Sequence, residues 1–192
     1  MTKGADQSPA ETQERLERLA RLIRSAGHVQ GLIPAQWDVL RYLSRANGFS
    51  NSPVATAQYL GATKGTISQT IMALVKKGLV ESETRGGDQR SVALHLSAKG
   101  RETLAQDPLA ALARDIEDLG GKTQRRFAKA VGELLLAETA RQQHASFGTC
   151  DSCRHLLHSR PPACTSFGAA LDESKLHLLC HRFKPVNKAE AK

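Results

Sequence analysis

The sequence predicts a mainly α-helical protein with a small β-wing. Apolar residues recur three or four positions apart in several separate segments, which is typical of amphipathic helices. Aromatic residues make up only 4% of the chain, so the core must consist largely of Leu, Ile, Val and Ala, which favours helices. One segment, residues 79–96, instead contains two strand-like runs around a loop with two glycines.

The first helix is predicted to begin near Glu11, after a polar arm at residues 1–10. Its apolar stripe contains Leu16, Leu19, Ala20 and Ile23, with arginines on the other faces. No nearby segment offers this stripe a partner. We therefore expect it to pack on a distant part of the chain or on another subunit.

A helix-turn-helix is the most readable element. Pro34 suits the first turn of a helix that buries Trp37 and Leu40. Ser52 before Pro53 is a helix-start signature, and Gly61 is a stop signal. Thr63 can then cap a further helix that ends at Gly78. Two short helices joined by a tight glycine turn are typical of the helix-turn-helix.

The second of these helices is predicted to have a polar outer face. Its buried face would consist of Ile67, Ile71, Leu74 and Val75. The opposite face then presents Lys64, Thr66, Ser68, Gln69 and Thr70, groups that can meet base edges and phosphates in a major groove. An ordinary solvated face is the alternative, but no acidic residue occurs from Thr63 to Lys77.

The runs LVESET and SVALHL predict two strands around the loop RGGDQR. Ser97 then opens a helix that the pair Asp107-Pro108 interrupts. LAALARDIEDLGG and RRFAKAVGELLLAETARQQ are further helical segments. This order predicts a winged helix-turn-helix inside a mostly helical protein.

The net charge of +8 and the pI of 9.6 indicate a polyanionic partner, with double-stranded DNA ahead of a membrane surface. We expect a cytoplasmic protein, because the sequence contains neither a signal-peptide pattern nor a long apolar segment. P-loop, GxSxG and HExxH motifs are absent, so we expect no enzyme. A metal- or thiol-dependent enzyme and a protein-binding module stay open as alternatives.

The motifs LIPAQWDVLRYL, LGATKGTISQTIMALVKKGLVE, RGGDQRSVALHLS and AKGRE stand in order between residues 30 and 101. In this combination the sequence resembles the MarR family of winged helix-turn-helix regulators. The resemblance implies a homodimer built from the first and last helices, a near-palindromic operator, and the possibility of a small-molecule effector. Together with the patterns above, it predicts the division 1–10 (flexible arm), 11–33 (dimerisation helix), 34–101 (winged helix-turn-helix DNA-binding domain), 102–146 (helical dimerisation region), 147–184 (cysteine-rich metal-binding tail) and 185–192 (disordered). The tail departs from the family pattern.

The wing contains Asp88 and Arg90, two residues apart and therefore on the same side of a strand. Asp88 can hold Arg90 or Arg85 in position, which would leave Arg90 to enter a narrow minor groove. The resemblance implies the same role for an Asp-x-Arg pattern. A solvated hairpin tip is the alternative.

All four cysteines lie in the tail, with the spacing C-x2-C-x10-C-x15-C: Cys150, Cys153, Cys164 and Cys180. Four thiolates suit a structural zinc ion or an iron–sulfur cluster. A single close pair favours the cluster over a zinc ribbon, while a thiol switch or two disulfides also stay open. Nearby histidines that can replace a thiolate are His155, His158, His177 and His181.

These observations predict a sequence-specific DNA-binding repressor with an iron–sulfur cluster in its tail that senses redox state or iron. Because the tail follows the last helix, we expect a change in the cluster to repack that helix and alter DNA binding. The alternative within the same class is a structural zinc ion in the tail and an effector site elsewhere.

Overall fold

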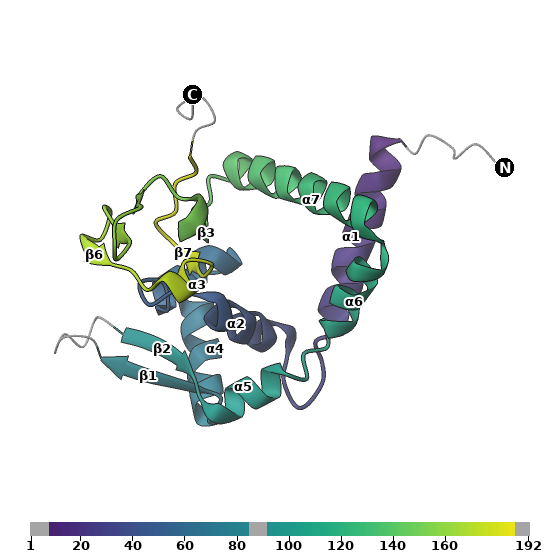
Figure 1. Ribbon diagram of the computed structural model, residues 1–192. Coiled ribbons are helices and arrows are strands. Elements are labelled where there is room, and N and C mark those ends of the chain that lie inside the picture. Colours follow the sequence, from purple (N-terminus) through teal and green to yellow (C-terminus); the bar gives the residue numbers. More distant parts are fainter. Residues whose placement is uncertain (1–7, 85–91, 187–192) are drawn as a thin grey trace.

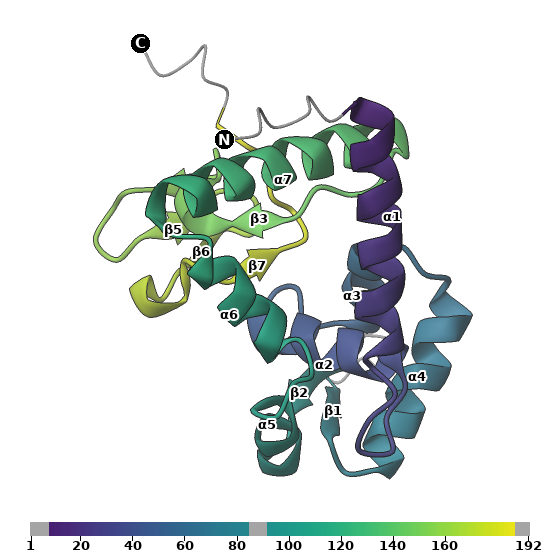
Figure 2. The same cartoon turned by 90° about the vertical axis from the view of Figure 1, so that its right-hand side faces the viewer.

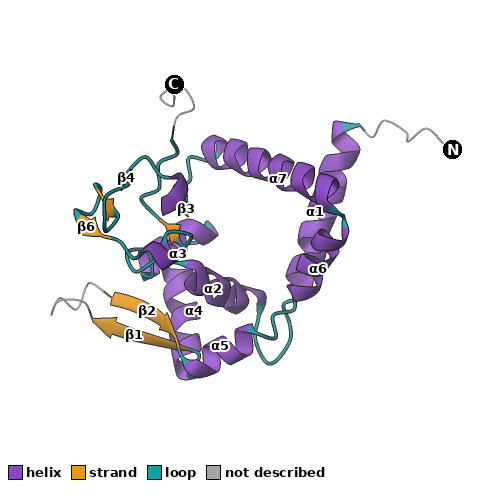
Figure 3. Cartoon of the chain, viewed as in Figure 1, coloured by secondary structure: helices purple, strands orange, loops and turns teal. Residues whose placement is uncertain are grey.

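The computed structural model describes residues 8–84 and 92–186. Its first part contains α1 (Pro9–Ser25), α2 (Pro34–Arg45), α3 (Pro53–Leu60), α4 (Lys64–Lys76), β1 (Val80–Thr84), β2 (Val92–Leu96), α5 (Ala98–Leu104), α6 (Ala110–Asp118) and α7 (Gly121–Arg141). The strands that follow are β3 (Gly148–Thr149), β4 (Leu156–Leu157), β5 (Ala163–Cys164), β6 (Ala169–Ala170) and β7 (Leu179–Cys180). Two 3-10 helices lie at Cys150–Ser152 and Glu173–Lys175. The mainly α-helical class with a small β-wing is confirmed (Figure 3).

The predicted helix boundaries in the helix-turn-helix are confirmed by their caps. The Ser52 side chain accepts a hydrogen bond from the backbone of Ala55 at 3.2 Å, and Pro53 is the first residue of α3. Gly61 ends α3 in the left-handed conformation with φ 61°, which glycine adopts without a Cβ clash. Thr63 caps α4 by accepting from the Thr66 backbone at 3.2 Å.

The core lies where α2, α3, α4 and the wing meet. Trp37 and Leu40 of α2 are fully buried, and Leu74 of α4 and Leu94 of β2 lie in the same apolar cluster. β1 and β2 pair antiparallel from Val80↔Leu96 to Thr84↔Val92. One tightly packed core therefore fixes α4 and the wing relative to each other.

Helices α6 and α7 extend away from this core (Figures 1 and 2). α6 packs against α7, and α7 runs across the top of Figure 1 from α6 towards the tail. Within the described chain, no residue of α1, α6 or α7 is buried. Among the described residues, no helix has both the length and the apolar character needed to cross a membrane.

The tail contains short β-structure that the sequence does not predict. β3 pairs with β7, and β4, β5 and β6 form a second small sheet. Each of these strands has only two residues, too few for an alternating pattern to be visible in the sequence.

Candidate DNA interface and cysteine site

The first half of α4 exposes polar side chains, and Met72 and Val75 are the exposed apolar residues of its second half. Its buried face contains Ile67, Ile71 and Leu74, as predicted. The predicted DNA-contacting residues on this helix are all exposed to solvent: Lys64, Thr66, Ser68 and Gln69. This face can donate and accept hydrogen bonds and carries one cation, which is the chemistry that base edges and phosphates require.

Two sequence expectations for α4 are wrong. Val75 was expected in the core but is 40% exposed. Thr70 was expected on the outer face but is buried, and its hydroxyl donates to the carbonyl of Thr66 at 2.9 Å. The apolar stripe of α4 is therefore rotated towards Thr70, whose hydroxyl is satisfied within the helix and can be buried at little cost.

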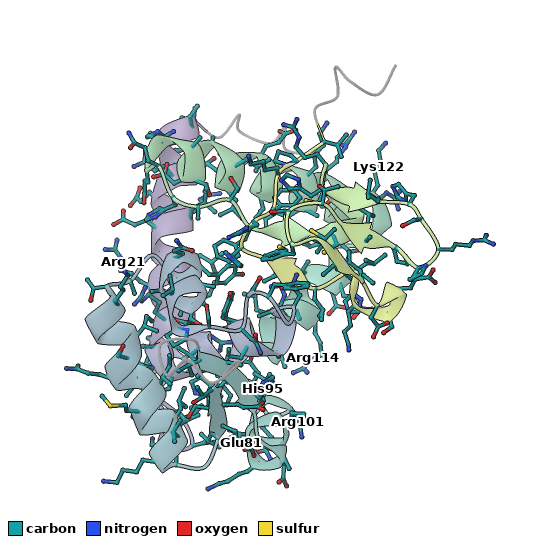
Figure 4. All side chains as sticks on the ribbon, turned by 90° about the vertical axis from the view of Figure 1, so that its left-hand side faces the viewer. Arg21, Glu81, His95, Arg101, Arg114 and Lys122 are labelled. Atoms are coloured by element: carbon teal, nitrogen blue, oxygen red, sulfur yellow. The ribbon has the colours of Figure 1, made fainter. Side chains whose placement is uncertain are left out.

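A surface groove of about 430 Å³ lies between α4 and the wing. Met72 and Val75 line it from the helix, and Val92 lines it from β2. On the wing itself, Glu81 lies opposite His95 (Figure 4). The predicted wing residues Arg85, Asp88 and Arg90 lie outside the described residues, so their proposed roles stay predictions.

Positive charge is not confined to α4. Figure 4 shows exposed basic side chains on α1, α5, α6 and α7, at Arg21, Arg101, Arg114 and Lys122. Net charge alone therefore does not locate the interface with DNA. The predicted DNA-contacting role of the α4 face rests instead on its polar composition and its exposure.

Exposed apolar side chains mark α1 and α7. Leu16, Leu19 and Leu22 of α1 are 41%, 40% and 58% exposed. On α7, Val131 and Leu134 are 41% and 55% exposed. A row of exposed leucines along a helix is typical of a surface that another helix covers.

The structure brings the four cysteines together. Cys150 begins the 3-10 helix that follows β3, Cys153 comes directly after that helix, Cys164 ends β5, and Cys180 ends β7. All four lie in the described chain, are buried and are free thiols. They line one small cavity of about 10 Å³, which is roughly the space that one water molecule or one ion needs.

The surroundings of Cys150 favour its neutral thiol form. Burial, together with the neighbouring thiols of Cys180, Cys153 and Cys164, raises the pKa of Cys150 to about 11. The Asn47 side chain opposes this shift by donating to the Cys150 sulfur at 3.9 Å. Four thiolates repel one another in a buried site unless a metal compensates their charge.

The thiols are not yet arranged as ligands. Within residues 8–84 and 92–186, no group of three or more His, Cys, Asp or Glu side chains forms a metal-binding set. The donor type and the shared cavity nevertheless fit a thiolate-bound metal. Among the nearby histidines, His155 also lines the cavity, while His158 and His177 are exposed.

The tail packs against the turn between α2 and α3. Leu179 is part of the apolar core, and its carbonyl accepts from the backbone of Asn47 at 2.9 Å. The Ser50 hydroxyl accepts from the His181 backbone at 3.0 Å. Sequence reasoning missed Asn47 and Ser50, because buried polar residues in a short polar turn look like an exposed loop.

A larger cleft lies between α3, α7 and the beginning of the tail. Its volume is about 690 Å³. Tyr59 and Gly61 line it from the helix-turn-helix, Leu135 from α7, and His144 and Phe147 from the following segment. Its size and mixed lining are within the range of small-molecule sites.

The sequence model of the MarR family matches residues 30–91. No curated protein matches the chain significantly. S. aureus MepR in complex with DNA is structurally similar, with 14% identity over 66% of this chain and 96% of that chain, at a TM-score of 0.55. A MarR transcriptional regulator from Methanosarcina mazei has 23% identity over 69% of this chain and 96% of that chain, at a TM-score of 0.54. A MarR protein from Peptoclostridium difficile has 17% identity over 74% and 95%, at a TM-score of 0.56. The TM-scores show that this chain shares the fold of these proteins.

Proposed function

We propose that the protein is a sequence-specific DNA-binding transcriptional regulator of the MarR type that acts as a repressor, because the sequence model of that family matches residues 30–91. The observation that carries the proposal is the exposed face of α4, with Lys64, Thr66, Ser68 and Gln69 and no acidic residue. The DNA-bound structure of MepR, which has the same fold, supports it further.

The roles on α4 follow from side-chain chemistry. Gln69 and Ser68 offer donor and acceptor pairs for base edges, and we assign them to sequence recognition. Lys64 lies in the first turn, where its ammonium group suits a phosphate, and Thr66 adds a hydroxyl beside it. If Arg90 enters the minor groove beside this helix, it reads the width of the groove.

The test begins with selection of a binding site from random duplex DNA, followed by affinity measurements on the selected operator. Gln69→Ala should weaken operator binding by about 1–3 kcal/mol and relax specificity at one base pair, because a base contact is lost. Lys64→Ala should weaken binding to all sequences and reduce the salt dependence. Gln13→Ala, at an exposed position of α1, is the matched control. Salt-independent binding, or an unaffected Gln69→Ala variant, would contradict the assignment.

We also propose that the chain forms a homodimer through α1 and α7. These helices have no buried residue within the described chain but carry exposed leucines. Burial of such surface contributes about 25 cal/mol per Å². A two-fold dimer would set two α4 helices about one DNA turn apart, which requires a near-palindromic operator.

For the tail we propose an iron–sulfur cluster held by Cys150, Cys153, Cys164 and Cys180. The convergence of four buried, free thiols on one cavity supports this ligand set. When bound, such a cluster would supply a redox-active centre that is sensitive to oxygen and to iron supply. The regulator would then act as a redox or iron sensor.

Zinc is the second candidate, and the small cavity favours it. About 10 Å³ of free space suits a single ion better than a cluster of several atoms. In that case the tail would be structural. The signal would then be a small-molecule effector, for which the cleft between α3 and α7 offers about 690 Å³.

A spectrum of anaerobically purified protein, with iron, zinc and sulfide assayed on the same sample, distinguishes the candidates. Absorption by thiolate-bound iron with matching sulfide supports the cluster, and a colourless protein with one zinc per chain supports the structural ion. Cys153→Ser should lose the metal, while Ser152→Ala, at its exposed neighbour, should retain it. Absence of every metal from anaerobic preparations would overturn both candidates.

A further inference from the structure

The turn between α2 and α3, Asn47–Asn51, lies between two parts of the molecule that the sequence separates widely. One side of the turn contacts the tail around Cys180, and the other side contacts β2 of the wing. The tail and the wing therefore both contact the same five-residue turn.

The contacts to the tail involve both neighbours of Cys180. The Asn47 backbone donates to the carbonyl of Leu179 at 2.9 Å. The His181 backbone donates to the Ser50 hydroxyl at 3.0 Å, and the Nδ1 atom of His181 lies 3.1 Å from the same oxygen. The Asn47 side chain donates to the Cys150 sulfur at 3.9 Å. The turn thus contacts one cysteine directly and a second through its neighbours.

The contacts to the wing come from the last residue of the turn. The Leu94 backbone of β2 donates to the carbonyl of Asn51 at 2.7 Å, and the Asn51 side chain donates to the Leu94 carbonyl at 3.1 Å. The next residue, Ser52, caps α3. Any displacement of the turn therefore reaches both β2 and the beginning of the helix-turn-helix.

Inside the turn, Asn47 and Ser50 form a single hydrogen-bonded unit. The Ser50 hydroxyl donates to Oδ1 of Asn47 at 2.8 Å, and Oδ1 also accepts from the Phe49 backbone at 3.1 Å. Asn47 is 6% exposed and Ser50 is fully buried. A buried polar group that loses its hydrogen-bond partner destabilises the fold, because water cannot reach it to replace the bond. Asn47 and Ser50 therefore favour one arrangement while the tail is docked.

We propose that Asn47 and Ser50 are positioning residues that couple the four-cysteine site to the wing and α3 of the same subunit. This proposal rests on the proposed function of the tail and of α4. When metal occupies the four-cysteine site, Leu179 and His181 are held in place. This fixes the turn and keeps the wing and α3 in the arrangement that binds DNA. When the site is empty, the turn is released. DNA binding must then also order the turn, which costs conformational entropy and weakens the affinity.

The decisive variant is Ser50→Ala, which removes the hydroxyl that joins His181 to Asn47 but leaves every cysteine in place. Ser174→Ala is the matched control, since Ser174 is an exposed tail residue whose hydroxyl bonds only locally to Asp172. Metal content, operator affinity of the loaded and the metal-free full chain, and amide hydrogen exchange at Leu94 are measured for each protein.

In wild type, we expect the metal-loaded protein to bind the operator about tenfold more tightly than the metal-free protein, a typical coupling between two sites. Ser50→Ala should retain the metal but reduce this ratio to about twofold or less, and its Leu94 amide should exchange faster. Ser174→Ala should match wild type in both. A purely structural role for Ser50 would lower affinity in both states and leave the ratio unchanged.

A full coupling ratio in Ser50→Ala, or unchanged exchange at Leu94, would overturn the proposal. Equal operator affinity of loaded and metal-free wild type would also overturn it, while leaving the metal and DNA proposals intact. If wild type binds no metal or no DNA, the proposed function fails instead, and exchange at Leu94 still decides whether the turn links the tail to the wing. Asn47→Asp, which keeps Oδ1 but replaces the donor to Cys150 by a carboxylate oxygen, replaces Ser50→Ala if that variant does not fold.

Discussion

A single ion pair at the residue scale ties α2 to the segment before α6. The Arg41 guanidinium donates twice to the Asp107 carboxylate, with both nitrogen–oxygen distances at 2.7 Å. The backbone of Leu109 donates to the same carboxylate at 2.8 Å. Burial alone would raise the pKa of Asp107, but the hydrogen bonds from Arg41 and Leu109 outweigh burial and lower it. The pair fixes where the chain leaves the core.

Replacing Asp107 should make the free energy of unfolding less dependent on pH in the acidic range. The folded-state pKa of Asp107 lies below its usual value of 3.8, so its contribution is complete above that value and is lost as the pH falls below it. Asp107→Asn should lower the free energy of unfolding by about 1.5–3 kcal/mol at pH 7. Urea unfolding at pH 7 and below pH 3.8 checks whether the difference from wild type shrinks in acid. Asp38→Asn, at the more exposed partner of Arg41, should cost less.

Gly100 is predicted to tolerate no side chain. A Cβ at this position would fall on the carbonyl oxygen of Leu79, so the beginning of α5 would have to move away from the core. Gly100→Ala should cost about 1–3 kcal/mol of stability in thermal or urea unfolding. Gly132→Ala is the matched control, because a Cβ there meets nothing within 4 Å and alanine favours the helix. Equal stability of the two variants would show that the approach of α5 to Leu79 is not needed.

Residue-level predictions from the sequence succeeded where local chemistry decides the outcome. Ser52 and Thr63 cap their helices as predicted, because a cap needs only its own next turn. Thr70 was misplaced, because burial of one threonine depends on how the whole helix is rotated in the core. Asn47 and Ser50 could not be predicted, because their partners are more than a hundred residues away.

At the scale of elements, the tail has too little regular structure to persist alone. Its strands contain two residues each, far below the length that is stable without further support. Its cohesion depends on the cysteine cavity and on the contacts of Leu179 with the core. The helices and the wing were predictable from periodicity, but this irregular element was not, since its structure follows from contacts between distant loops.

If the proposed metal is bound, its removal should loosen the tail before it affects the rest of the fold. Limited proteolysis of chelator-treated protein should produce cuts between Cys150 and Cys180, while α2 to α4 resist cleavage, because all but one of the buried residues of their core, Leu179, lie outside the tail. Mass spectrometry of the fragments locates the cuts. Identical fragments before and after chelation would indicate that the tail is held by protein contacts alone.

For the whole molecule, the proposed homodimer depends on the exposed faces of α1 and α7. Leu134→Glu places a charge at a 55% exposed leucine of α7 and should convert a dimer into a monomer, with weaker operator binding because two half-sites no longer act together. Light scattering after size exclusion measures the mass. Leu157→Glu, at a 50% exposed leucine of the tail, should leave the dimer intact. A monomeric wild type would refute the role of both helices.

The contact between Ser50 and His181 spans 131 positions of the sequence, and this separation sets an order of events during synthesis. A chain emerging from the ribosome can complete α2, α3, α4 and the wing long before His181 leaves the exit tunnel. During that interval Ser50 and Asn47 lack their tail partners, so the nascent helix-turn-helix is folded in outline but not yet fixed in its final arrangement. Long-range closure of this kind is also slow. If the tail and the wing are coupled as proposed, the protein acquires its full affinity for DNA only after translation has passed the last cysteine.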